Sequence, residues 1–328
     1  MGKLVFIFKR LGSCVITLMI LSFVIFSLLF LAPGDPARSL VGTRNATPEL
    51  LAQIRAQYHL DEPFLVQYAR WLEGVTRLDF GTSIRTNQDV IEYITPFSII
   101  TFQLVALSLV ISVTCGLVLG VIAAKGQNKL RDRFINVIAI GGSSAPGFAV
   151  GLILLYIIAF KLGLLPVYGS GTIWHLILPA ITLAIGISAS IIKITRQAMI
   201  AEIQTDYTTF MRARSIHPFR ITLSQLKNAS PTVFTSTGLV LAALFGSTVL
   251  VESVFALPGL GNLLASSVTF RDVPVVQFLA LMMAVIICLS SALVDILVYL
   301  VNPLQSNQLQ SQTHILDQTQ VVKKGGVS

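Results

Sequence analysis

Charged side chains are scarce in this sequence. Asp, Glu, Lys and Arg make up 12% of its 328 residues, about half of the roughly 25% that is typical of soluble domains. Hydrophobic residues make up 54%, and the mean hydropathy is +0.80. This composition excludes an ordinary soluble domain and predicts an all-α integral membrane protein.

Motifs for catalysis and for nucleotide binding are also missing. The sequence contains no G-x-x-x-x-G-K-[ST] phosphate loop, no H-E-x-x-H and no G-x-S-x-G. Its three cysteines (Cys14, Cys115 and Cys288) lie far apart in apolar runs, and its four histidines are scattered. We therefore expect no disulfide framework, no metal site, no cofactor and no catalytic activity.

Six apolar segments are long enough to cross a bilayer, since about 20 residues cover roughly 30 Å of hydrocarbon. Five of them carry no charged residue, and the sixth contains Asp295. The first has a longer apolar core than a cleavable signal peptide, so we expect a retained anchor. The predicted spans are 11–31, 98–124, 134–160, 173–192, 231–251 and 275–301.

The net charge of +8 is explained better by membrane topology than by nucleic-acid binding, because Lys and Arg concentrate in cytoplasmic loops. With a cytoplasmic N-terminus, 15 of the 23 basic residues fall in cytoplasmic segments. We therefore expect both termini and the segment 193–230 on the cytoplasmic side.

The stretch 32–97 is expected to lie outside the membrane and to be partly helical. Thr47 followed by Pro48 is typical of a helix N-terminus, and Leu65, Tyr68 and Leu72 recur at helical spacing. Two short amphipathic helices are therefore predicted. The chain then divides into an N-terminal part (1–97), a five-helix core (98–304) and a flexible cytoplasmic tail (305–328).

Two carboxylates occupy positions at membrane depth, where ionisable groups are rare. Glu252 ends the fifth predicted span, and Asp295 lies within the sixth. Each either lines a translocation pathway or binds a backbone or basic group, and the sequence leaves both alternatives open. Pro146 and Pro179 predict kinks in the third and fourth spans, because proline removes a helical hydrogen bond.

A turn and a short helix are expected between the last two spans. Pro258 and Gly259 are a strong turn signal, and Gly261 is a second permissive position. The following "NLLASSV" is too short to cross the membrane. We expect it to form a short external or re-entrant helix capped by Asn262.

The segment 193–230 is too long for a simple loop. The helix of the fourth span is expected to continue through "KITRQAMIAEI", and Thr205 or Asp206 to cap a second, short helix. This helix would have an apolar edge (Tyr207, Phe210, Met211) and a basic edge (Arg212, Arg214, Arg220), and Pro218 would end it. About ten residues are marginal for an isolated helix, so it needs either anionic lipid or a groove on another protein.

These residues resemble the cytoplasmic "EAA" region of bacterial ABC-importer permeases, in the dipeptide, oligopeptide and nickel branch. The chain also fits that family at the end of its first span, Ala32-Pro33-Gly34-Asp35-Pro36. Ser215 stands where the family has glycine. The pattern consists of Asp206-Tyr207, Arg212-Ala213-Arg214, Pro218, Arg220 and Lys227-Asn228-Ala229, followed by Glu252, Phe255, Pro258-Gly259-Leu260-Gly261, Arg271-Asp272, Pro274-Val275-Val276-Gln277, Asp295 and Asn302-Pro303.

The resemblance implies a non-catalytic permease subunit with the six-helix type I importer fold in a bacterial inner membrane. Its implied partners are a second homologous permease subunit, two ATP-binding subunits, an external solute-binding protein and the lipid membrane, with no nucleic acid. The residues it implies for coupling to the ATP-binding subunit are Asp206, Tyr207, Arg212, Ala213, Arg214, Ser215, Pro218 and Arg220. Candidates for the pathway or its gate are Glu252, Asp295, Pro258, Gly259 and Gly261.

Peptides are the expected substrate, with nickel or a metal–chelator complex as the alternative in the same branch. The alternative from another class is an ion-driven secondary transporter. It would require inverted repeats with paired broken helices, and the sequence shows no such halves.

Overall fold

The computed structural model describes residues 3–31, 36–41, 47–57 and 60–301. Over these residues the chain is helical and has no named strand, which confirms the predicted all-α class. The predicted tail 305–328 lies outside the described residues. The elements are α1 (Lys3–Leu31), α2 (Pro36–Val41), α3 (Pro48–Gln57), α4 (Phe64–Thr76), α5 (Val90–Lys125), α6 (Leu130–Ser144), α7 (Gly147–Leu154), the π-helix η1 (Leu155–Lys161), α8 (Ile173–Ile203), α9 (Asp206–Ala213), α10 (Pro218–Val254), α11 (Leu260–Thr269) and α12 (Val273–Val301).

Four helices of the described chain are long and apolar enough to cross a membrane. They are Val5–Ser27 within α1, all of α5, all of α8, and Val273–Leu293 within α12. α10 contains the fifth predicted span, and the described residues Ala243–Val254 form a shorter apolar stretch within it. By length and composition, the described residues thus offer four possible spans, or five with the bent pair described next, and six stays a prediction.

The third predicted span, 134–160, is not one helix. α6 ends at Ser144, and α7 with η1 continues at an angle of 106° to it. Pro146 stands at this break, immediately before α7, where its missing N–H costs no helical hydrogen bond. Pro179 has a smaller effect, because α8 continues through it.

The centre of the fold is the close packing of α5 against α8, with α10 beside them. α5 buries small residues four positions apart, namely Ser108, Ser112, Gly116 and Gly120. A Cβ on Gly120 would lie 2.6 Å from that of Thr195 in α8, so glycine is what permits this approach. Each serine hydroxyl donates to the carbonyl four residues earlier over 2.7 Å, which satisfies it inside the buried interface.

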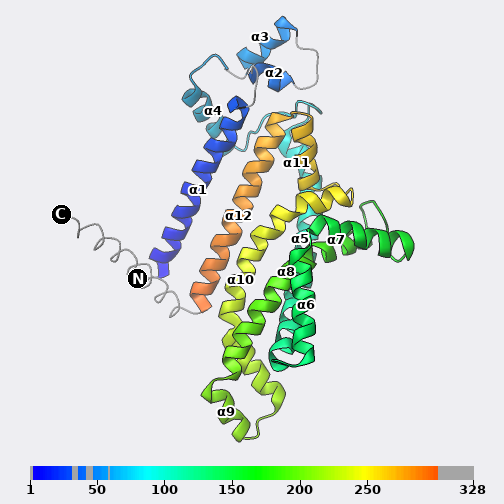
Figure 1. Cartoon of the computed structure of the whole chain (residues 1–328). Coiled ribbons are helices and arrows are strands. Elements are labelled where there is room, and N and C mark those ends of the chain that lie inside the picture. The colour runs from blue at the N-terminus through cyan, green and yellow to red at the C-terminus, as the bar shows by residue number, and fades with distance from the viewer. Residues whose placement is uncertain (1–2, 32–35, 42–46, 58–59, 302–328) are drawn as a thin grey trace, which may run out of the picture.

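Several of the shorter helices lie at two opposite ends of the molecule, whereas α7 projects sideways between them (Figure 1). In Figure 1, α2, α3, α4 and α11 lie at the upper end, and α9 lies at the lower end, beyond the other helices. The first residues of α1 and the last residues of α12 point toward the α9 end. This arrangement places the candidate coupling segment and the predicted external segments on opposite sides.

Both helices predicted in the stretch 32–97 are present as α3 and α4. α3 starts at Pro48, and the Leu50 N–H donates to the Thr47 hydroxyl over 3.3 Å, as expected of an N-cap. α4 packs on α1 through aromatic rings, with the centroids of Tyr68 and Phe23 5.3 Å apart. The six-residue α2 was not predicted.

Candidate functional site

α9 is held between α8 and α10 by hydrogen bonds that converge on Glu202, near the end of α8. Tyr207 donates to the Glu202 carboxylate over 2.7 Å, and Thr205 and Thr208 donate to its carbonyl over 2.6 and 2.8 Å. From α10, the Gln225 amide donates to the Thr208 hydroxyl over 3.2 Å. Thr208 and Gln225 are buried, so α9 is tied to both long helices.

The start of α9 differs from the predicted cap. Thr205 is the N-cap residue, but its hydroxyl bonds back to Glu202 and makes no cap hydrogen bond to α9. Burial raises the pKa of Tyr207, and the neighbouring Glu202 raises it further. Tyr207 therefore remains a protonated hydrogen-bond donor at neutral pH.

The outward face of α9 is formed by Phe210 and its basic neighbours. The Phe210 side chain is 62% exposed, and the Arg214 guanidinium carbon lies 5.6 Å from its ring centroid. Asp206, Arg212, Ala213 and Arg220 are also exposed. The prediction of one apolar edge is wrong, because Tyr207 and Met211 are half-buried while Phe210 faces outward.

α9 ends in a tight turn around Ser215 and not at Pro218. The Ser215 N–H donates to the Arg212 carbonyl over 2.9 Å, and the Ile216 N–H donates to the Met211 carbonyl over 3.2 Å. Ser215 has a φ of 54°, and these two bonds form a Schellman motif. Pro218 is the first residue of α10, so the prediction that it ends α9 is wrong.

Replacing Ser215 with glycine is expected to stabilise the chain by about 1 kcal/mol. Left-handed backbone costs an L-residue roughly 1–2 kcal/mol that glycine does not pay, and the greater freedom of unfolded glycine offsets part of this gain. Thermal unfolding in detergent would measure the change. Ser215→Val should have the opposite effect, and equal melting temperatures for both variants would contradict the strained turn.

At the opposite end of the molecule, Glu252 is fully buried at the end of α10. Its carboxylate accepts hydrogen bonds from the Thr101 hydroxyl over 2.6 Å, the Gly261 N–H over 2.8 Å and the Asn262 N–H over 3.1 Å. The Leu260 N–H in turn donates to the Thr101 hydroxyl over 2.8 Å. One carboxylate thus joins α10, α5 and the first turn of α11, where the helix dipole favours a negative charge.

The two glycines of the predicted turn make room for this carboxylate. A Cβ on Gly259 would overlap the Glu252 carboxyl group, and one on Gly261 would lie 2.5 Å from the Cα of Val249. The predicted short helix is present as α11, but its N-cap is Gly259 and not Asn262. Pro258 precedes this cap. A role of these residues in gating stays a prediction.

Asp295 has a basic partner from another helix. It forms an ion pair with Arg10 of α1, whose guanidinium also donates to the Ser291 hydroxyl over 3.1 Å. Both side chains of the ion pair are about one third exposed. This ion pair agrees with the alternative in which Asp295 binds a basic group. A pathway role for Asp295 stays a prediction.

Two further buried carboxylates make contacts that the sequence did not predict, although Asp272 belongs to the pattern quoted above. Asp132 of α6 accepts two bonds from the Arg196 guanidinium of α8, over 2.6 and 2.7 Å. Asp272 accepts from the Ser83 hydroxyl over 2.5 Å and from the Ile84 N–H over 3.1 Å. The first carboxylate ties α6 to α8, and the second ties the segment between α4 and α5 to the start of α12.

Two family models match this chain. A model described as "Binding-protein-dependent transport system inner membrane component" matches residues 116–307, and a second, for the N-terminal part of such membrane components, matches residues 3–104. Together the two models cover most of the described chain.

Curated relatives align over nearly their whole length. The "Glutathione transport system permease protein GsiC" of Salmonella typhimurium is 35% identical over 299 residues, which are 91% of this chain and 97% of the relative. The "Probable peptide ABC transporter permease protein y4tP" of Sinorhizobium fredii is 35% identical over 308 residues, covering 91% and 98%.

A solved structure supports the fold alone. A chain from "Inward facing conformations of the MetNI methionine ABC transporter" superposes with a TM-score of 0.55 at 18% identity, covering 64% of this chain and 96% of that one.

Proposed function

Because this chain belongs to the family of binding-protein-dependent transport system inner membrane components, we propose that it is a permease subunit of an ATP-driven peptide importer. It forms half of a translocation pathway with a second homologous permease subunit. Two ATP-binding subunits supply the energy, and a solute-binding protein delivers the peptide to the outer end. The permease chain itself is not catalytic.

The observation that carries this proposal is the displayed helix α9. A short helix fixed at its base, with an exposed aromatic side chain and exposed arginines, is suited to insert into a groove of a partner. The names of two relatives, one for glutathione and one for peptides, support a peptide substrate. Glutathione is itself a small peptide.

The contacts of α10 suggest how movement of α9 reaches the membrane. At one end Gln225 bonds to Thr208 of α9, and at the other Glu252 bonds to α5 and α11. A displacement of α9 by the ATP-binding subunits would therefore shift α8 and α10 as rigid bodies. Such a shift is the kind of step that alternating access requires.

We place the α9 end in the cytoplasm of a bacterium, with the chain in its inner membrane and both termini on the cytoplasmic side. Arg212, Arg214 and Arg220 lie in the α9 segment and are exposed, in agreement with the excess of positive charge in cytoplasmic loops. Six membrane crossings, with the bent α6–α7–η1 pair as the third, would put both termini on one side.

Uptake by a strain that lacks this chain tests the proposal. Uptake of a labelled dipeptide or of labelled glutathione should fall to background and return on complementation with the intact gene. Uptake of a labelled sugar is the control. If only nickel uptake fell, the peptide assignment would be wrong while the permease assignment stood; unchanged uptake of all of these solutes would count against both.

A further inference from the structure

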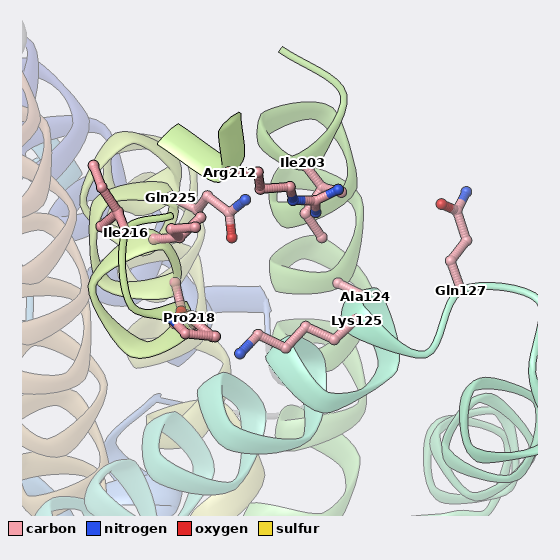
Figure 2. A pocket seen from close by; sticks show the side chains of 10 residues that line it. Ala124, Lys125, Gln127, Ile203, Arg212, Ile216, Pro218 and Gln225 are labelled. Atoms are coloured by element: carbon pink, nitrogen blue, oxygen red, sulfur yellow. Dashed lines mark hydrogen bonds between the residues drawn. The ribbon is translucent and has the colours of Figure 1, made fainter. Parts of the chain in front are cut away.

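A pocket of ≈ 590 Å³ opens beside α9, between the ends of α5 and α8 and the first turns of α10. Figure 2 shows Lys125 reaching across one side of this pocket toward Pro218, with Arg212 and Gln225 on the other side. Ile203, Ile216 and Ile221 supply apolar lining. Two cations from different helices thus border one partly enclosed space.

These two cations have no acidic partner in the described part of the chain. None of the residues that line the pocket is acidic, and neither Lys125 nor Arg212 forms an ion pair with a described residue. Glu202, which precedes α9, accepts its hydrogen bond from Tyr207 instead. A concave site that carries two positive charges and has apolar walls attracts an anion.

The helices that line the pocket end at different distances from the predicted membrane spans. Lys125 directly follows the predicted second span, 98–124. Ile203 follows the end of the predicted fourth span by eleven residues of continuous helix, which corresponds to roughly 16 Å along the axis. The α5 side of the pocket is therefore expected near the membrane surface, and the α8 and α9 side farther from it.

We propose that this pocket receives a carboxylate of the ATP-binding subunit, from an Asp or Glu side chain that contacts Lys125 and Arg212 together. The proposal rests on the function inferred above, in which α9 docks on that subunit. Arg212 belongs both to the pocket and to the predicted docking segment, so the two surfaces are continuous. A guanidinium fork binds a carboxylate with two hydrogen bonds, and an ammonium completes the site as a point charge.

This contact would connect the ATP-binding subunit directly to α5. α5 packs closely against α8 at Gly116 and Gly120, where the Ile191 and Thr195 side chains of α8 leave no room for a Cβ on either glycine. Movement of the ATP-binding subunit would be transmitted to α5 through the carboxylate and Lys125, and to α8 and α10 through α9. Coupling would then reach the centre of the bundle through two connections.

Carbodiimide crosslinking of the purified complex tests the proposal. The reagent condenses a lysine amine with a carboxylate that contacts it, which forms an amide. The carbodiimide takes up the released water and becomes a urea. We expect mass spectrometry to find Lys125 joined to an Asp or Glu of the ATP-binding subunit. Lys125→Arg keeps the charge but should abolish this crosslink, because a guanidinium does not form the amide under these conditions.

A binding measurement adds a second readout. Lys125→Glu should weaken binding of the ATP-binding subunit about 10-fold, whereas Lys125→Arg should leave it nearly unchanged. Lys129→Glu is the matched control, because Lys129 is exposed nearby but does not line the pocket. Equal effects of Lys125→Glu and Lys129→Glu would mean that only net charge matters and would overturn the site.

The outcomes separate this inference from the proposed function. A photo-crosslinker at Phe210 should capture the ATP-binding subunit if α9 docks there. Capture from Phe210 with Lys125 joined only to this chain, or to nothing, would overturn the pocket contact alone. Failure of both crosslinks in an intact complex would overturn the docking role of α9 as well.

Discussion

Replacing Glu252 with alanine is expected to lower the free energy of unfolding by about 4 kcal/mol. The substitution leaves the Thr101 hydroxyl and the N–H groups of Gly261 and Asn262 without their acceptor, in a site where Glu252 itself is fully buried. Each unsatisfied buried donor costs roughly 1–3 kcal/mol, and its hydrogen bond to a carboxylate is among the stronger kinds. α11 should also lose its fixed position at the end of α10.

Two further variants make this prediction specific to the hydrogen bonds. Glu252→Gln keeps one carbonyl acceptor and should cost about half as much. Ser253→Ala is the matched control on the same turn, because Ser253 is exposed and bonds only to a carbonyl of its own helix. Thermal unfolding in detergent measures stability, and limited proteolysis reports the release of α11.

The same variants separate the two alternatives for Glu252. A carboxylate that only lines a pathway could be removed with little change in stability and a large change in uptake. A stable Glu252→Ala variant with altered uptake would therefore contradict the structural role. A large loss of stability for Glu252→Ala, with a smaller loss for Glu252→Gln, would support the structural role.

Local signals in the sequence predicted several helices well. Thr47-Pro48 marks the start of α3, and the apolar periodicity after residue 192 predicts the continuation of α8 to Ile203. These features depend on residues a few positions apart. The 106° bend at Pro146 was underestimated as a kink, because proline permits a break but the packing of neighbouring helices sets its angle.

The carboxylate contacts could not be predicted, because their partners are distant in sequence. Glu252 and Thr101 are separated by 151 positions, and Asp132 and Arg196 by 64. Nothing in the composition of either segment specifies the other. The close approach of α5 to α8 was within reach, since Gly116 and Gly120 lie four positions apart in an apolar helix, which is typical of a helix-packing interface.

The turn after α9 shows how a pattern and a structure can inform each other. The resemblance places glycine where this chain has Ser215, and the structure gives Ser215 the left-handed backbone that glycine favours. The turn is thus retained despite the substitution. Because two backbone hydrogen bonds define it, the side chain at this position changes its stability and not its shape.

Replacing Phe210 with alanine is expected to weaken binding of the ATP-binding subunit about 100-fold, or about 2.7 kcal/mol. Exposed aromatic residues beside arginine are frequent energetic centres of protein interfaces, and Phe210 is 62% exposed on α9. The fold should be unaffected, since exposed substitutions usually change stability by less than about 0.5 kcal/mol. Binding would be measured with purified permease in detergent, and uptake in cells should fall with it.

Phe234→Ala is the matched control for Phe210, because Phe234 has a similar exposure of 59% but lies in α10 near the start of the fifth predicted span. It should leave binding of the ATP-binding subunit unchanged. Suppose that Phe210→Ala leaves binding of the ATP-binding subunit unchanged, and that an α9 peptide with the same substitution associates less with anionic vesicles. This result would favour the membrane-surface alternative. The two alternatives make opposite demands on Phe210, since one places its ring in a protein groove and the other among lipid chains. A loss confined to protein binding would therefore establish α9 as a docking helix, because lipid contact predicts no such loss.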